Sequence, residues 1–174
     1  MSKNILIRTI IFAVALLAIS CGQKAPQIVE LKHFPLDNLD GIITLSNVEI
    51  DKAVTSDSNG SMRITAPDTT VVKLFEVNDI NIENARLIYQ ANIRCENLAG
   101  YAFLEMWCHF PGRGDFFSRA LQNPITGTTN WITAEAPFFL QKGEKPDIIR
   151  LNFVVAGKGT AWIDNIRLLK APLQ

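Results

Sequence analysis

The segment 101–110, "YAFLEMWCHF", alternates aromatic and polar side chains in a way that suits ligand binding. In a β-strand, side chains two positions apart point to the same face. Aromatic rings can stack on the apolar face of a sugar, while neighbouring polar groups hold its hydroxyls. The alternation therefore predicts a glycan-binding face, whose members are Tyr101, Phe103, Glu105, Trp107 and His109.

The preceding segment, 85–95, also alternates and is expected to lie beside the aromatic segment. We predict that "ENLAG", residues 96–100, is the turn of a hairpin that joins the two strands. The polar side chains that this hairpin would add to the glycan-binding face are Arg86, Gln90, Asn92 and Arg94. An alternative stays open, because aromatic faces in β-sandwiches are usually buried. In that case the N-terminal tether or the loop 111–130 covers the rings.

Residues suited to catalysis are sparse. Cys108 and His109 are adjacent, so in a regular strand they point to opposite faces and cannot form a dyad. The only other histidine is His33, which leaves too few for a typical catalytic zinc site. Glu105 would need a second carboxylate to act as a glycosidase, and no acid is identified for that role. We therefore predict a non-catalytic protein, and a small glycan hydrolase is the least favoured alternative.

The first twenty residues have the features of a targeting segment. Lys3 and Arg8 precede an apolar run over 10–19, which is too short to span a bilayer as a helix. The run ends in "LLAISCGQK", which resembles the lipobox of bacterial lipoproteins, although Ala18 stands where that family prefers Leu. The resemblance implies a signal peptide over 1–20, lipid attachment at Cys21 and, from Gly22, an outer-membrane destination in the bacterial envelope. The alternative is an ordinary secretory signal or a short anchor.

The charge balance gives no support for a nucleic-acid partner. The leader holds two of the 17 basic residues and none of the 17 acidic ones, which leaves 15 basic residues against 17 from Cys21 onward. A nucleic-acid-binding domain normally carries a marked basic excess. The expected partners are instead a glycan or another envelope protein, with the membrane reached through the lipid on Cys21.

The remaining chain reads as a tether over 21–40 followed by one all-β domain over 41–171. Short runs of β-like alternation are separated by turn residues, and no window keeps a helical period. Many short antiparallel strands favour a β-sandwich or a barrel. In the predicted hairpin, Cys95 and Cys108 are too far apart along the strands for a disulfide, so both are expected to be buried free thiols. The alternative is a disulfide, which would need a bulge or a longer loop to bring the two together.

Three segments resemble, in order, the galactose-binding-like jelly rolls found in many carbohydrate-binding modules. They are "TSDSNGSMRI" (55–64), "GTTNWITAEAPFFL" (127–140) and "GKGTAWIDNIRL" (157–168). The resemblance implies a jelly-roll β-sandwich of two antiparallel sheets. It says little about function, because this fold has many roles. We expect an envelope lipoprotein that binds a glycan, and the alternative is a structural or partner-binding lipoprotein without a sugar ligand.

The same resemblance implies a structural Ca²⁺ at the closing strand. Calcium requires six to eight oxygen ligands. The candidate ligands are Asp164, the turn that contains Ser58 and Gly60, and either Glu49 or Asp51. In a regular strand Asp164 would share a face with Trp162, Ile166 and Leu168, and would point toward the core if that face is inward. The alternative is that Asp164 caps backbone N–H groups or pairs with an arginine.

Overall fold

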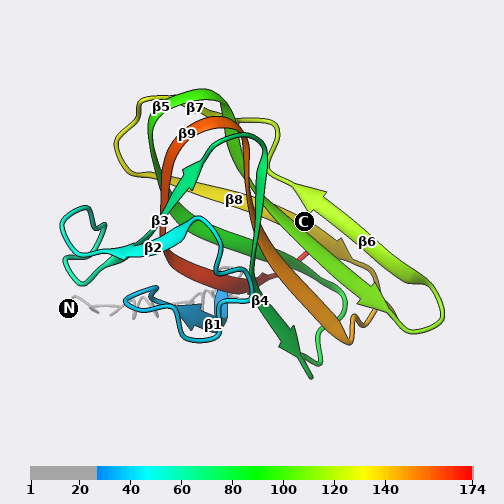
Figure 1. Cartoon of the computed structure of the whole chain (residues 1–174). Helices are drawn as coiled ribbons and strands as arrows, with labels where there is room; N and C mark the ends of the chain where they lie inside the picture. Colours follow the sequence, from blue (N-terminus) through cyan, green and yellow to red (C-terminus); the bar gives the residue numbers. More distant parts are fainter. Residues whose placement is uncertain (1–26, 174) are drawn as a thin grey trace, which may run out of the picture.

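Two long strands organise the fold (Figure 1). The structure is a computed structural model, and it describes residues 27–173. The two long strands are β5 (Ala85–Phe110) and β9 (Ile148–Ala171), which pair antiparallel along most of their length. The shorter strands are β1 (Val29–Phe34), β2 (Val48–Asp51), β3 (Ser61–Ala66), β4 (Thr70–Asn78), β6 (Gly114–Arg119), β7 (Ile125–Gly127) and β8 (Ile132–Leu140). The all-β jelly-roll sandwich predicted from the sequence is confirmed. Across residues 27–173, no helix is long and apolar enough to cross a membrane.

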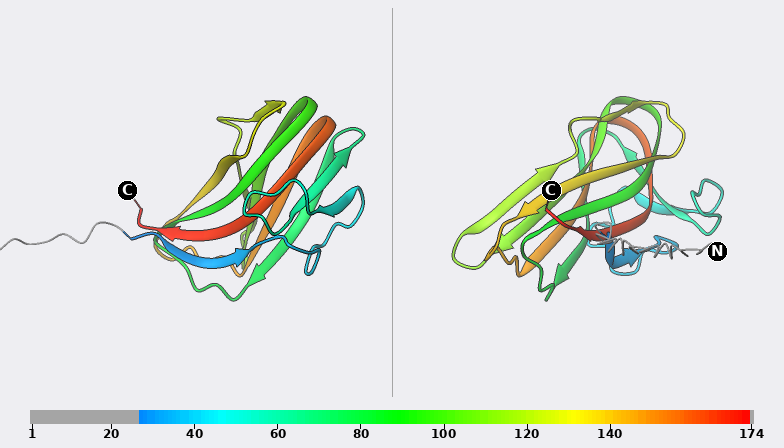
Figure 2. Two further views of the ribbon diagram at one scale, coloured as in Figure 1. Left: turned by 90° about the vertical axis from the view of Figure 1, so that its left-hand side faces the viewer. Right: turned by 180° about the vertical axis from the view of Figure 1, so that it is seen from behind.

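Both long strands bend and therefore belong to both layers of the sandwich. In the first layer, called sheet I, the strand order is β6–β5–β9–β4, with the second half of β5 beside the first half of β9. In sheet II the order is β8–β5–β9–β3–β2, and β1 also pairs with β9. Figure 2 shows the two layers and β1 running beside the end of β9.

The bend lies where Gly100 of β5 faces Gly157 of β9. Their φ angles are 137° and 139°, a conformation that residues with a side chain rarely adopt. A Cβ on Gly100 would stand 2.0 Å from the carbonyl oxygen of Ala156, and one on Gly157 would stand 2.0 Å from that of Ala99. Because neither residue has a side chain, the backbones of β5 and β9 can lie this close together and bend at the same place. The predicted hairpin at 96–100 is wrong, because this segment is a bend within one strand.

The alternation of side chains along both halves of β5 separates a core face from an outer face. The core face of β5 carries Ala85, Leu87, Tyr89, Ala91, Ile93, Cys95, Ala102, Leu104, Met106, Cys108 and Phe110, and Leu98 at the bend also enters the core. On the outer side of the strand, Ile88, Phe103 and Glu105 are buried as well, with 2%, 7% and 5% of their surface exposed. Cys95 and Cys108 are both free, as expected, although the reason differs: the bend places them in different layers. Burial raises the pKa of each thiol to about 12.

The folded part of the chain begins earlier than the sequence suggested. Residues 29–34, assigned to the tether, form β1 and pair with β9. Leu31 and Phe34 pack against the core, and the Phe34 ring stacks on Phe75 with centroids 3.9 Å apart. These apolar contacts explain why so polar a segment forms an edge strand. The predicted signal peptide and Cys21 lie outside the described residues.

Candidate functional site

The aromatic residues of 101–110 lie on the outer face of sheet I, because their neighbours along β5 fill the core. We call this surface the Trp107 face. The register of β5 with β6 and β9 places on it Tyr101, Phe103, Glu105, Trp107 and His109 from β5, Asp115, Phe117 and Arg119 from β6, and Arg150, Asn152 and Val154 from β9.

Glu105 lies at the centre of the Trp107 face and is only 5% exposed. Its Oε1 accepts hydrogen bonds from Trp107 Nε1–H at 2.7 Å and from Asn152 Nδ2 at 3.0 Å. Its Oε2 accepts one from Arg119 Nε–H at 2.6 Å. Burial alone would raise the pKa of Glu105, but these three bonds and the Arg119 charge outweigh it and lower the pKa. Glu105 is therefore an ionised anchor for its neighbours and is poorly suited to donate a proton.

The Trp107 indole is held on two sides. Glu105 binds its N–H, and the ring of Phe117 lies 4.9 Å away at an interplanar angle of 46°. The Arg119 guanidinium in turn lies over Phe117, 4.4 Å from the ring centroid. Phe117 is 51% exposed, so this ordered group presents a ring to solvent. Side chains fixed before binding lose less entropy when a ligand arrives.

A second pair of rings lies further along the same face. Tyr101, 42% exposed, stacks on Phe103 with centroids 5.8 Å apart and an interplanar angle of 26°. At the other end of β5, His109 Nδ1 lies 2.6 Å from Asp147 Oδ1, and this bond lowers the pKa of Asp147. The Trp107 face thus has two aromatic pairs with Glu105 between them.

The structure divides the predicted glycan-binding residues between two faces. Arg86, Gln90 and Asn92 belong to the first half of β5, which lies in sheet II. Gln90 donates to Glu135 at 2.6 Å, and Asn92 donates to Ser56 Oγ at 3.1 Å. The expectation that these side chains extend the Trp107 face is wrong. Because β5 bends instead of reversing, the outer faces of its two halves lie on opposite layers.

The loop 111–130 contains contributors that the sequence reading missed. It was interpreted as irregular, but it holds β6 and β7, and β6 supplies Phe117 and Arg119. The alternation of Asp115, Phe117 and Arg119 after the turn "PGRG" was the available signal.

The strands formed by the tether and by the loop 111–130 do not lie over the rings, as the alternative interpretation required. β6 extends sheet I sideways, and β1 joins sheet II. The chain after β1 runs along the edge of β4, where the backbone N–H of Thr44 donates to the carbonyl of Lys73 at 2.9 Å. The Trp107 face is nevertheless only partly open: Tyr101 and Phe117 are 42% and 51% exposed, whereas Phe103, Glu105, Asn152 and Val154 are buried.

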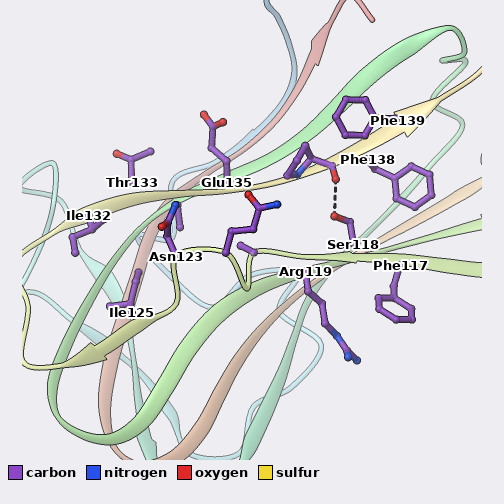
Figure 3. A pocket seen from close by; sticks show the side chains of 14 residues that line it. Phe117, Ser118, Arg119, Asn123, Ile125, Ile132, Thr133, Glu135, Phe138 and Phe139 are labelled. Carbon is purple, nitrogen blue, oxygen red and sulfur yellow. Dashed lines mark hydrogen bonds between the residues drawn. The ribbon is translucent and has the colours of Figure 1, made fainter. Parts of the chain in front are cut away.

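Beside the Trp107 face, a cavity of about 700 Å³ opens between β6, the segment 120–125 and β8 (Figure 3). We call it the edge groove. Its lining residues are Phe117, Ser118, Arg119, Ala120, Gln122, Asn123, Ile125, Ile132, Thr133, Ala134, Glu135, Pro137, Phe138 and Phe139. Near its Phe139 end, Ser118 Oγ donates to the carbonyl of Pro137 at 2.6 Å and joins the two strands.

The acid in the closing strand points away from the core. Ala161 and Ile163 are core residues, and so are Ile166 and Leu168, which breaks strict alternation. The cause is a β-bulge at Asn165, which has a φ of 52° and lies beside a shift in the register with β5. After the bulge, the residues that face the core are one position further along the chain. The assumption of a regular strand, with Asp164 sharing a face with Ile166 and Leu168, is wrong.

Asp164 is nevertheless fully buried, because the turn after β2 covers it. Its Oδ2 accepts from the backbone N–H of Ser56 at 2.9 Å, and its Oδ1 accepts from that of Asn165 at 2.8 Å. Burial raises the pKa of Asp164 in spite of these bonds. Asp164 therefore ties the closing strand directly to the early turn, which matches the capping alternative.

The oxygen donors expected for calcium are engaged by N–H groups. Glu49 accepts from Arg63 at 2.8 Å, and Asp51 accepts from Trp162 Nε1–H at 3.0 Å. The Lys52 ammonium lies at the turn, where it donates to the carbonyls of Asp37 and Asn59 at 2.7 Å and 2.9 Å. The same ammonium lies close to Gly60, and the Ser58 N–H, which donates to Thr55 Oγ1, fixes the shape of the turn. Within the described range, no three His, Cys, Asp or Glu side chains cluster as metal ligands. This donor set does not fit a calcium ion.

Comparisons with solved structures explain the architecture. The chain is similar to the CBM22-1 xylan-binding domain from Paenibacillus barcinonensis Xyn10C, with a TM-score of 0.61 and 11% identity, covering 87% of this chain and 99% of that one. The fold is that of carbohydrate-binding modules. A xylan-binding domain from CBM 22 gives 0.56 at 8% identity over 83% of this chain and 97% of that one. Family 16 Carbohydrate Binding Module-2 gives 0.55 at 13% identity over 75% and 91%. No family model and no curated protein matches the sequence.

On this fold, the polar groups at the centre of the Trp107 face already have partners. Its one buried acid holds three neighbouring side chains, and its imidazole is paired with Asp147. What remains available to a ligand is ring surface and the free edges of polar groups. That combination provides stacking and hydrogen bonding.

Proposed function

We propose that this protein is a non-catalytic envelope protein that binds a glycan on the Trp107 face. The observation that carries the proposal is the Trp107 ring, which Glu105 fixes through a hydrogen bond and which lies beside the exposed Phe117 ring. A sugar could stack on such rings without first ordering them. Two structures of the same fold are named as xylan-binding domains, which supports a glycan as the ligand class.

The test is retention by a panel of soluble polysaccharides in native affinity electrophoresis. The wild type should be retarded by at least one neutral polysaccharide, and Trp107→Ala should weaken binding about thirtyfold, equivalent to a contact of about 2 kcal/mol. Ile28→Ala is the control, because Ile28 is an exposed apolar side chain, at 60%, that directly precedes β1 of sheet II. Equal retention of Trp107→Ala and the wild type would place binding elsewhere.

Attachment to the outer membrane through a lipid on Cys21 is part of the proposal and rests on the sequence alone. Cells that express the protein should incorporate labelled palmitate into it. Cys21→Ser should abolish that label, because the thiol is the expected attachment point. A labelled Cys21→Ser variant would contradict this part.

The second candidate is a partner-binding envelope protein without a sugar ligand. It is favoured by the exposed apolar side chains on and around β6 and β8, namely Phe116, Phe117, Leu121, Ile132 and Phe139. Such clusters often mark protein interfaces. A stoichiometric partner recovered from a detergent extract, together with no retention by any glycan, would favour it over the first. The hydrolase alternative requires glycan turnover that Glu105→Gln removes.

A further inference from the structure

The edge groove and the Trp107 face meet at β6. Phe117 and Arg119 line the groove, and the same two residues pack beside Trp107 and Glu105. Figure 3 shows Ile125 and Ile132 at one end of the groove and Phe138 and Phe139 at the other. The side chains of Phe117 and Arg119 point away from β8, so a chain-like ligand that crosses the rings of Trp107 and Phe117 would reach the groove by passing around the edge strand β6.

The charged groups at the groove already have partners. Arg119 is bound to Glu105 at 2.6 Å, and Glu135 accepts from Gln90 at 2.6 Å. By contrast, the side-chain amides of Gln122 and Asn123 make no hydrogen bond to any residue in 27–173, and both residues are exposed. The second oxygen of Glu135 and the terminal nitrogens of Arg119 stay available, but these two side chains carry opposite charges, so the lining has no net charge to attract an ion. The unpaired amides of Gln122 and Asn123 suit hydroxyl groups.

The hydroxyls of Ser118 and Thr133 donate to Pro137 O and Asn92 Oδ1, and most of the remaining lining is apolar and includes open ring surface. Ile125, Ala134 and Phe138 are buried or partly buried, and Phe139 is 54% exposed. A cavity of about 700 Å³ lies within the usual range for small-molecule sites, about 300 to 1,000 Å³. Apolar walls with a few convergent amides are suited to a sugar unit, which has one apolar face and a rim of hydroxyls.

We infer that the edge groove is a second subsite for the same ligand, and that it holds a further unit of a neutral glycan whose chain lies on the Trp107 face. This inference rests on the proposed function. It adds the place where the glycan chain continues beyond the Trp107 face. It also names the ligand class, which is a polysaccharide without charged groups.

The experiment compares the wild type, the double variant Gln122→Ala/Asn123→Ala and Trp107→Ala in gels that contain xylan, galactan, mannan, β-glucan or polygalacturonate. Asn81→Ala/Gln141→Ala is the matched control, since it removes two exposed amides in turns outside the groove. Loss of two neutral hydrogen bonds should weaken retention by the best neutral polysaccharide about tenfold. The control should behave like the wild type, and polygalacturonate should not retard any form.

A measurement on the wild type guards against misfolded variants. In ¹⁵N spectra, the side-chain amide signals of Gln122 and Asn123 should shift when short oligomers of the retained polysaccharide are added. If Trp107→Ala abolishes retention while the double variant binds normally and its amide signals do not move, the groove subsite is refuted and the proposed function stands. If polygalacturonate is the preferred ligand, the neutral class is refuted. If no polysaccharide retards the wild type, the proposed function and the subsite fail together.

Discussion

Replacement of Glu105 tests whether one buried carboxylate holds the Trp107 face in place. In Glu105→Gln the amide oxygen can still accept from Trp107 and Asn152, but the amide NH₂ faces the Arg119 N–H, and that hydrogen bond is lost. A hydrogen bond to a charged group contributes about 1.5–3 kcal/mol. The Arg119 side chain is 39% exposed and can be hydrated, so we expect a smaller loss of about 1–2 kcal/mol.

Glu105→Ala removes all three acceptor interactions. Asn152 is 8% exposed, so its side-chain amide would be left buried without this acceptor. The Trp107 N–H, which is partly buried, would lose its acceptor too. An unsatisfied buried donor costs about 1–3 kcal/mol, and we expect a total loss of about 3–4 kcal/mol. Urea unfolding at neutral pH measures both variants. A loss under about 1 kcal/mol for Glu105→Ala would refute this account of the network.

The pH dependence gives an independent check. The pKa of Glu105 is lowered in the folded protein, so the unfolded chain, with a pKa near ~4.3, binds the proton more tightly. The stabilisation from the carboxylate is therefore complete above ~4.3 and is lost as the pH falls through the folded pKa. The difference in unfolding free energy between wild type and Glu105→Gln should shrink over this acidic range. A difference that stays constant with pH would contradict the assignment.

Two further predictions concern the scaffold. Gly157→Ala should lower the unfolding free energy by at least about 4 kcal/mol, because its Cβ would stand 2.0 Å from the carbonyl oxygen of Ala99; a urea midpoint close to that of the wild type would disprove the strained corner. Lys52→Met should destabilise the turn after β2 by about 1 kcal/mol, since two carbonyls lose their donor, while Lys158→Met, in another exposed position, should have little effect. In the same thermal-shift assay, calcium or a chelator should leave the melting temperature of the wild type unchanged. A clear rise with calcium would show that a metal, and not Lys52, completes this turn.

Local alternation was sufficient to predict which β5 side chains enter the core and which aromatic residues share an outer face. It could not show that 96–100 is a bend, because Gly100 turns the corner only in partnership with Gly157, which is distant in sequence. Since the bend sends the two halves of β5 to different layers, Arg86, Gln90 and Asn92 were assigned to the wrong face.

The other misassignments have similarly local causes. A single left-handed residue, Asn165, shifts the phase of the closing strand, and a period-two pattern cannot anticipate it. β6 follows a Pro- and Gly-rich turn, so its short alternation was taken as part of a loop. As a result, Phe117 and Arg119, which complete the surroundings of Trp107, were missed.

The most direct test of the central claim follows the indole signal of Trp107 during a glycan titration. Trp162 is the internal control, because it is 3% exposed and lies in sheet II between Arg63 and Arg94. In ¹⁵N-labelled protein, the Trp107 Nε1–H resonance should move as oligomers of the retained polysaccharide are added, while that of Trp162 stays in place. Saturable glycan binding with an unmoved Trp107 resonance would contradict the assignment of the Trp107 face as the glycan-binding surface.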